Sequence, residues 1–182
     1  MVNDRMETSV PDIYAVGDAV QVKNFVTDEN ALISLAGPAN KQGRIAADNI
    51  CGIESRYGGS QGSSVIKIFD MTAASTGINE KTAKSVGISC DKVILSPMSH
   101  AGYYPGGKVM TVKALFEKET YRLLGAQIIG FDGVDKRIDV LATAIRAEMK
   151  AYELAELDLA YAPPYSSAKD PVNMAGYIIE NI

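Results

Sequence analysis

Hydrophobic and polar positions follow two different periods along the chain, which separates predicted strands from predicted helices. The segment Val65–Met71 alternates apolar and polar residues, as a half-buried strand does, and residues 91–95 form a second short strand-like run. Two longer runs, Met110–Lys118 and Tyr121–Phe131, are separated by a short polar stretch, which predicts a β-hairpin. These segments together predict an antiparallel sheet of about four to five strands.

The strongest helical period follows the predicted hairpin. Apolar residues recur there at spacings of four, three, four and four, on a single helix face, at Val134, Ile138, Leu141, Ile145 and Met149. Shorter helices are predicted over three further segments, 79–87, 153–157 and 171–179. Strands joined by hairpin-like links and then helices indicate an α+β domain, with the helices on one side of the sheet.

The N-terminal part has too few elements for a core of its own. Residues 12–16 read as a short buried strand that ends in a Gly-Asp turn. Residues 29–50 read as a helix in which Gly37 and Pro38 must lie at a kink or in the first turn. The Gly- and Ser-rich stretch Ser55–Ser64 reads as a linker. We therefore expect two parts, an incomplete unit over residues 1–58 and a domain over 63–182.

Composition narrows the classes of function. The 182 residues carry a formal net charge of −4, which argues against nucleic acid as the main partner. No apolar run approaches the ~20 residues of a membrane helix, and nothing at the start resembles a signal peptide, so we expect a cytoplasmic protein. Cys51 and Cys90 are far apart, which supports neither a metal site nor a redox pair and favours packing roles. The pair Lys136–Arg137 is interpreted as part of a solvated face.

A Gly-Asp turn after a strand is the first candidate for chemistry. The carboxylate of Asp18 can accept hydrogen bonds from a polyol, although it could equally cap the next helix or turn. The surrounding segment TSVPDIYAVGDA, Thr8–Ala19, resembles the second flavin-binding motif of the pyridine nucleotide-disulfide oxidoreductases. Leu35–Ile50 resembles the helix that follows it. The resemblance implies that Asp18 binds the ribityl chain of FAD and that Ala36 approaches the flavin ring.

Two tyrosine-containing loops are the second candidate. SHAGYYPGG, Ser99–Gly107, also holds the only histidine, which has no acid or nucleophile partner in view. LAYAPPYSSAKDPVNMAGY, Leu159–Tyr177, contains two consecutive prolines that keep the chain extended and display Tyr161 and Tyr165. Stacking on a neighbouring surface, or a clamp on a dimer, would explain either loop without chemistry.

Both loops resemble those of the coenzyme A-disulfide reductase, NADH oxidase and persulfide reductase branch. In that branch two tyrosines, one per loop, reach the flavin and the cysteine-coenzyme A disulfide of the other subunit. The resemblance implies this catalytic role for Tyr103 and Tyr161, with Tyr104 and Tyr165 as rivals, and a cofactor contact for Tyr161. Lys169 is a candidate for binding a coenzyme A phosphate.

The resemblance covers essentially the whole chain but only the end of a flavin domain and a dimerisation domain. The chain has no GxGxxG motif after a strand and no redox cysteine of the family. We therefore expect a C-terminal, inactive part of a homodimeric flavoenzyme whose missing domains bind FAD and NAD(P)H and reduce a coenzyme A disulfide or persulfide. A water-forming NADH oxidase or peroxidase is the alternative within the family, and a non-catalytic dimerisation module is the alternative outside it. The resemblance leaves open the choice of NADH or NADPH, and whether a rhodanese-like domain is also present.

Overall fold

The computed structural model describes residues 1–180 and divides the chain into two compact units, Met1–Gly62 and Ser63–Ile182. Each unit has its own sheet and its own helices, and the two are described separately below. None of the helices among the described residues is both long and apolar enough to cross a membrane.

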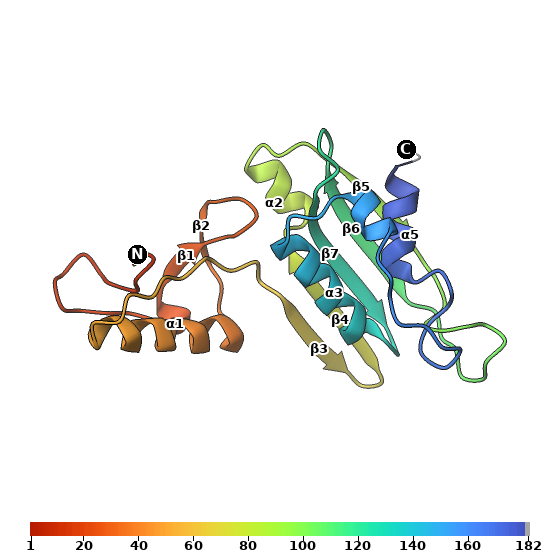
Figure 1. Cartoon of the computed structure of the whole chain (residues 1–182), viewed down its shortest axis with the longest axis horizontal. Helices are drawn as coiled ribbons and strands as arrows, with labels where there is room; N and C mark the ends of the chain where they lie inside the picture. The colour runs from red at the N-terminus through yellow and green to blue at the C-terminus, as the bar shows by residue number, and fades with distance from the viewer. Residues whose placement is uncertain (181–182) are drawn as a thin grey trace. The chain divides into compact units, whose positions relative to one another are not determined.

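The second unit is built on a five-stranded antiparallel sheet (Figure 1). Its strands lie in the order β3-β4-β7-β6-β5, so the two strands of the β6–β7 hairpin are neighbours in the sheet. Their bounds are β3 Ser64–Ile68, β4 Met71–Gly77, β5 Cys90–Leu95, β6 Thr111–Glu117 and β7 Leu123–Gly130. The predicted α+β class and the predicted hairpin are confirmed. β4 has no counterpart among the predicted strands, because its Ala, Ser and Thr residues show no clear alternation of apolar and polar side chains.

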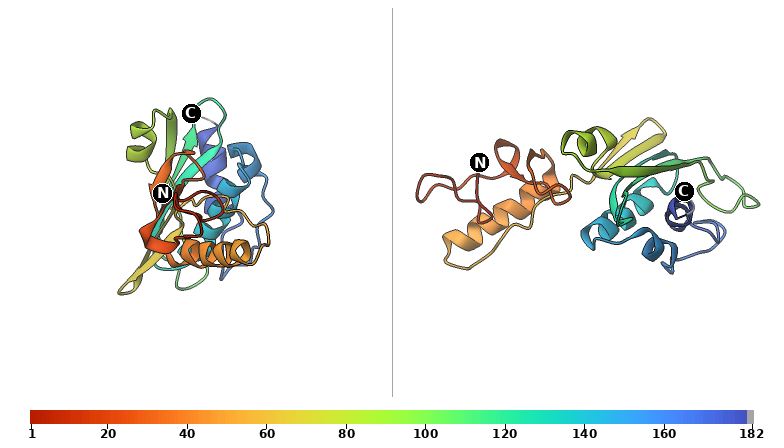
Figure 2. Two further views of the ribbon diagram at one scale, coloured as in Figure 1. Left: turned by 90° about the vertical axis from the view of Figure 1, so that its left-hand side faces the viewer. Right: turned by 90° about the horizontal axis from the view of Figure 1, so that it is seen from above.

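Two helices cover one face of this sheet (Figure 2). α3, Val134–Arg146, packs on β4 and β7, and α5, Pro171–Ile179, packs on β5 and β6. The short α4, Ala151–Ala155, packs against α5, and α2, Glu80–Ser85, follows β4. The side chains between the helices and the sheet form the core, in which Phe116, Leu124 and Leu141 are fully buried.

The ends of these helices follow local side-chain chemistry. Asn79 caps α2, since its Oδ1 accepts a hydrogen bond of 2.9 Å from the backbone N–H of Thr82. Asp170 caps α5 in the same way, and Pro171 occupies the first position, where no N–H partner is needed. α3 ends at Arg146, so the prediction that Met149 continues its apolar face is wrong. Glu148 there adopts a left-handed φ of 54°, which ends the helical path.

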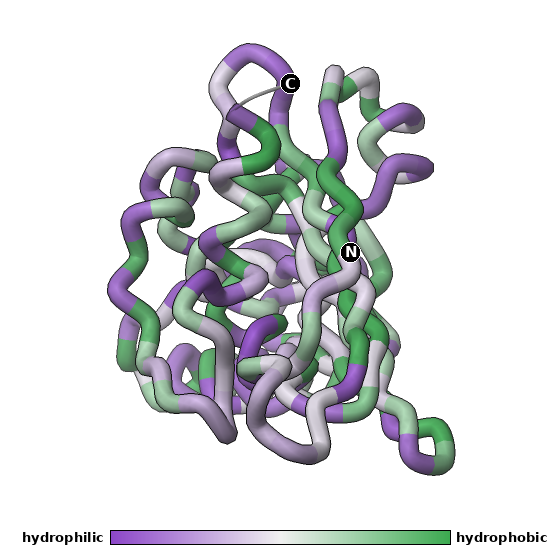
Figure 3. The backbone as a smooth tube through the Cα atoms, turned by 90° about the vertical axis from the view of Figure 1, so that its right-hand side faces the viewer, coloured by the Kyte–Doolittle hydropathy of each residue, from purple (hydrophilic) through white to green (hydrophobic). Residues whose placement is uncertain are grey.

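The opposite face of the sheet is open, and its edge strand is exposed. Val65, Ile66 and Ile68 of β3 all lie in contact with solvent, so the prediction of a half-buried strand is wrong. The reason is that β3 has only one neighbouring strand and lies beyond the strands that α3 and α5 cover. Figure 3 shows hydrophobic and hydrophilic residues interleaved along the backbone. Apolar alternation therefore identified the strand but not its burial.

The first unit is smaller and differs more from the prediction. It contains the 3-10 turn η1, Gly17–Ala19, the antiparallel strands β1, Gln21–Lys23, and β2, Asn30–Leu32, and the helix α1, Ala36–Ile50. The predicted buried strand at residues 12–16 is wrong: only a single bridge joins Tyr14 to Glu7, and Ile13 is exposed. The helix predicted over residues 29–50 begins only at Ala36, seven residues later than predicted, because residues 30–32 pair with β1. Gly37 and Pro38 lie in the first turn of the observed helix.

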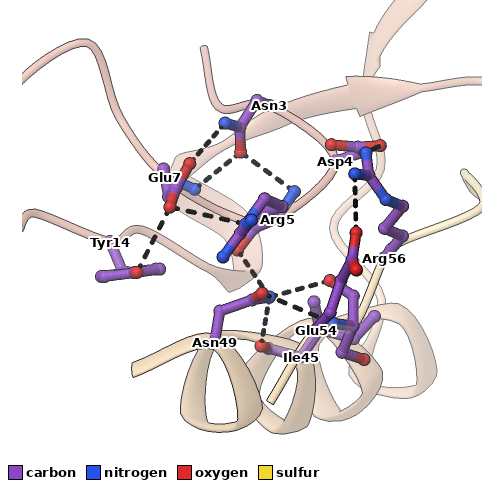
Figure 4. Close-up of polar contacts among 10 residues, drawn as sticks. Asn3, Asp4, Arg5, Glu7, Tyr14, Ile45, Asn49, Glu54 and Arg56 are labelled. Atoms are coloured by element: carbon purple, nitrogen blue, oxygen red, sulfur yellow. Dashed lines mark hydrogen bonds and ion pairs between the residues drawn. The ribbon is translucent and has the colours of Figure 1, made fainter. Parts of the chain in front are cut away.

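Polar contacts hold the N-terminal segment of this unit against α1 (Figure 4). The Asn49 side-chain amide donates to the backbone oxygens of Arg5, Ile45 and Ser55, at 3.3, 2.8 and 2.8 Å. Beside it lies a small apolar cluster formed by Met6, Val20, Val22 and Ala46. The buried Asn49 therefore links α1 to the N-terminal segment at Arg5 and to the segment that follows the helix at Ser55.

Candidate functional site

Two loops of the second unit bring a pair of tyrosines together. The first loop, residues 96–110, joins β5 to β6, and the second, residues 156–170, joins α4 to α5. The Tyr103 and Tyr161 hydroxyl oxygens lie 3.0 Å apart, within hydrogen-bonding distance, and either phenol can be the donor. A backbone hydrogen bond of 2.9 Å from the N–H of Ala101 to the oxygen of Ser166 joins the same loops. Residues 58 positions apart in sequence thus form one polar pair.

The pair of hydroxyls is accessible to a ligand. Tyr103 is 77% exposed and Tyr161 is 48% exposed, so a ligand can reach both hydroxyls. The hydrogen bond with Tyr103 raises the pKa of Tyr161 above its ordinary value, and partial desolvation acts in the same direction. Two phenol hydroxyls in contact can share one hydrogen bond and still present one donor to a ligand.

The rival tyrosines are placed differently. The ring of Tyr104 meets the ring of His100 edge-on, with centroids 5.7 Å apart. Tyr165 is exposed, and its backbone N–H bonds to the oxygen of Ala162 within its own loop. Among the four candidate tyrosines, only Tyr103 and Tyr161 have a hydrogen bond between their hydroxyls within the described residues.

The only histidine is buried beneath the first loop. His100 Nδ1 lies 3.1 Å from the carbonyl oxygen of Ala101, a contact that requires the Nδ1-protonated form. Gly107 packs against the ring so closely that an added Cβ would lie 3.1 Å from Cε1. His100 therefore supports the shape of the loop, in line with its lack of a catalytic partner in the sequence.

A buried arginine lies under both loops. Arg137 is 1% exposed, so the interpretation of Lys136–Arg137 as a solvated face is wrong for Arg137. Its Nη2 lies 3.1 Å from Asp170 Oδ2, and it donates to the backbone oxygen of Ser99 at 3.0 Å and to Ser166 Oγ at 3.2 Å. No local signal marks it, because the carboxylate that neutralises it is 33 residues away.

Lys169 lies beside a cavity of mixed charge. It is exposed and lines a hollow of about 690 Å³ between α4, α5 and the second loop. Glu156 and Asp158 line the same cavity. The lysine can therefore meet an anionic ligand, but two carboxylates share the same space.

The residues expected to contact a flavin are in the first unit. Asp18 lies in η1 and Ala36 is the first residue of α1, and both are exposed. The N–H of Gly17 donates to Gln42 Oε1 at 2.8 Å, which fixes the turn to α1. No side chain caps the first turn of α1, so its backbone N–H groups are available to an electronegative ligand.

Neither cysteine has the features of an activated thiol. Cys51 is exposed and lies at the C-terminal end of α1. Cys90 lies on β5, and desolvation, with a smaller contribution from Glu80, raises its pKa.

Comparison with known proteins gives the context of this geometry. Residues 63–171 match the family described as pyridine nucleotide-disulphide oxidoreductase, dimerisation domain. Among curated proteins, a coenzyme A disulfide reductase of Staphylococcus haemolyticus is 40% identical over 97% of the chain and 40% of its own length. An NADH oxidase of Methanocaldococcus jannaschii is 37% identical over 96% of the chain and 39% of its own length.

Solved structures agree in fold. The reduced CoADR-RHD of Bacillus anthracis is 52% identical with a TM-score of 0.94, and the match covers 99% of this chain and 32% of that one. An NAD-dependent persulfide reductase from A. fulgidus is 43% identical with a TM-score of 0.95, covering 99% of this chain and 33% of that one. The chain thus spans about 40% of the length of the curated relatives it matches. From the family match over most of the second unit and from these relatives, the chain belongs to the pyridine nucleotide-disulphide oxidoreductase family.

Proposed function

We propose that this chain is the C-terminal portion of an FAD-dependent NAD(P)H oxidoreductase that reduces a coenzyme A disulfide or a persulfide-type acceptor. In this proposal residues 1–58 complete the FAD-binding domain, and residues 63–182 form the dimerisation domain of a homodimer. The observation that carries it is the hydrogen bond between the exposed hydroxyls of Tyr103 and Tyr161. In this proposal the chain by itself is inactive, because it spans only about 40% of the length of the curated relatives and has no GxGxxG motif for binding a dinucleotide.

The two phenols suit the breaking of a sulfur–sulfur bond. The leaving sulfur develops negative charge, and a positioned donor lowers the barrier by sharing or giving a proton. The hydrogen bond with Tyr103 raises the pKa of Tyr161, which favours the protonated form that can act as a donor. Tyr103, in turn, fixes the direction of the Tyr161 hydroxyl. Lys169 is assigned to a phosphate of coenzyme A, since it is exposed at the mouth of a cavity beside the second loop.

The first unit fits one wall of a flavin site. FAD, when bound, would carry electrons from NAD(P)H to the sulfur acceptor. Asp18 offers an exposed carboxylate on a turn held by Gln42, which suits hydrogen bonds from the ribityl hydroxyls. Ala36 is small and exposed at the uncapped start of α1, so backbone N–H groups there can approach the ring.

The decisive experiment uses the full-length protein with Tyr161→Phe. We expect the rate of disulfide or persulfide reduction to fall about a hundredfold, as for loss of a general acid. Flavin reduction by NAD(P)H, followed in a stopped-flow instrument, should stay near that of the unaltered protein. Tyr104→Phe is the matched control, because its ring contact with His100 survives without the hydroxyl. Equal losses in both half-reactions would assign Tyr161 a structural role instead.

A water-forming NADH oxidase or peroxidase is the alternative within the family, favoured by the similarity to an NADH oxidase. Assays of the unaltered full-length protein distinguish this alternative from the proposed disulfide or persulfide reductase. Consumption of one O2 for every two NADH oxidised, or of one hydrogen peroxide for every NADH in the case of a peroxidase, with no turnover of coenzyme A disulfide, would replace our proposal with this alternative.

A non-catalytic dimerisation module is the second candidate function, favoured by the open face of the sheet. Ile66, Ile94 and Ile129 lie on three strands there and are 59%, 58% and 44% exposed. Burial of such residues stabilises a two-fold interface. Light scattering of the chain should then report roughly twice 19.5 kDa. A monomer at high concentration would contradict this candidate.

A further inference from the structure

Among the residues that the structure describes, Arg137 has the largest fully buried side chain, and its guanidinium joins three separate segments. Arg137 lies in the first turn of α3. Its Nη1 donates to the backbone oxygen of Gly133 at 3.0 Å. Its Nη2 reaches Ser99 in the first loop and Ser166 in the second, at 3.0 and 3.2 Å. Because α3 is packed on the sheet, these contacts tie both loops to a rigid element.

A carboxylate completes the cluster and extends it to α5. Asp170 is 3% exposed and faces the guanidinium, with Oδ2 at 3.1 Å from Nη2 and Oδ1 at 3.4 Å from Nε. The hydroxyl of Ser166 donates to Asp170 Oδ2 at 2.7 Å, and the N–H of Val172 donates to Oδ1 at 3.0 Å. The buried charge is therefore paired and hydrogen-bonded, as burial requires.

The local backbone is adapted to this arginine. Gly133 adopts a φ of 69°, and a Cβ at that position would lie 2.2 Å from Arg137 Nη1. Any larger residue there would displace the guanidinium. A planar fork with five donors can serve these five oxygens in different directions, whereas a lysine ammonium is a compact point charge and cannot reproduce this geometry.

Both tyrosines of the pair lie within the two loops that this cluster joins. Tyr103 follows Ser99 by four residues, and Tyr161 precedes Ser166 by five. We infer that Arg137, held by Ser166 and Asp170, is a positioning residue that sets the two loops so that the hydroxyls of Tyr103 and Tyr161 meet. The functional value of this arrangement rests on the function proposed above, but the arrangement itself can be tested without flavin or substrate.

The test is photo-oxidative coupling of tyrosines in the chain, with the Tyr103–Tyr161 dityrosine quantified by peptide mass spectrometry. Coupling joins two rings after each phenol has lost one electron and one proton to the added oxidant. It therefore reports how often the phenols are adjacent. We expect the unaltered chain to form this cross-link within a single chain, as shown by a mixture of isotope-labelled and unlabelled protein.

Two variants address the cluster. Ser166→Ala removes the hydroxyl that bonds to both Arg137 and Asp170 but leaves the two charges paired with each other. We expect the cross-link yield to fall about tenfold or more, as for loss of hydrogen bonds to charged groups. Arg137→Lys should lower it further, because it loses the fork. Arg122→Lys is the matched control: Arg122 pairs with Glu117 and Glu148 at the partly exposed β6–β7 hairpin and touches neither loop.

The outcomes separate positioning from stability and from catalysis. A fall in yield for Ser166→Ala, with an unchanged far-ultraviolet circular dichroism spectrum and an unchanged control, supports the inference. Unchanged yields in Ser166→Ala, or no intrachain Tyr103–Tyr161 cross-link in the unaltered chain, would overturn it. If Arg137→Lys does not fold, the serine variant alone decides. Normal turnover of Tyr161→Phe in the full-length protein would overturn the proposed function while leaving this result untouched.

Discussion

Removing the carboxylate of Asp170 should be among the most damaging single changes in the second unit. The side chain is 4% exposed and has three partners: the Arg137 guanidinium, the Ser166 hydroxyl and the backbone N–H of Val172. Asp170→Ala leaves a buried guanidinium without its counter-charge, at a cost of about 3–5 kcal/mol. It also removes the cap of α5, which adds about 1 kcal/mol. We expect a loss of about 4 kcal/mol or more, against a total of about 5–15 kcal/mol for a domain.

The assay is urea unfolding followed by far-ultraviolet circular dichroism. With a slope of about 2 kcal/mol per M, the transition of the second unit should move by about 2 M to lower urea. The chain contains no tryptophan, and tyrosine fluorescence provides a second probe. The urea midpoint of Asp170→Asn should lie between those of the unaltered protein and Asp170→Ala, because the amide oxygen can still cap α5 while the charge is lost.

The matched control is Asp70→Ala in the exposed turn between β3 and β4. Its effect should stay within about 0.5 kcal/mol, as for most surface changes. A loss below about 1 kcal/mol for Asp170→Ala would refute the reasoning, because a buried, paired arginine cannot lose its carboxylate partner at so small a cost.

Further predictions concern the sheet, α1 and the charge on α2. Gly125→Ala would place a Cβ 1.9 Å from the backbone oxygen of Ile78, so we expect the free energy of unfolding, measured in urea, to fall by about 3 kcal/mol. Gly43→Ala, with open space around it, should instead stabilise α1 by up to about 1 kcal/mol. Equal effects of the two glycine changes would contradict the packing of β7. The ammonium of Lys113, with a second lysine on β5, lowers the pKa of Glu80 to about 2. This depressed pKa contributes stability above pH about 4.5 that is lost as pH falls toward about 2, so Glu80→Gln should flatten the acid dependence of the melting temperature in that window. An unchanged acid slope would show that the pair does not form in solution.

Local sequence signals determined the elements whose ends depend on neighbouring residues. The bounds of α5 follow from an aspartate cap followed by proline, and α2 begins after an asparagine cap. The apolar face of α3 and the β6–β7 hairpin could be identified because burial on one side imposes a period on the residues. Each of these signals acts over a few residues, so no knowledge of the rest of the chain was required.

Signals of this kind failed where pairing over long distances overrides local preference. β4 consists mainly of small residues and is held as a strand by β3 and β7 on its two sides. Residues 30–32 match a helical period but pair with β1. Ile13 is apolar yet exposed, because no neighbouring element of the first unit covers it.

The candidate site shows the same division. The sequence alone indicated the two tyrosine loops and, through resemblance, the residues within them. Only the tertiary structure decided which hydroxyls meet, since the distance between Tyr103 and Tyr161 depends on the packing of both loops on α3. It also reversed the interpretation of Arg137, a charged residue whose burial is possible only because Asp170 arrives from 33 positions away to neutralise it. Periodicity records which side of an element is covered, whereas the partner of a buried charge is set by the path of the whole chain.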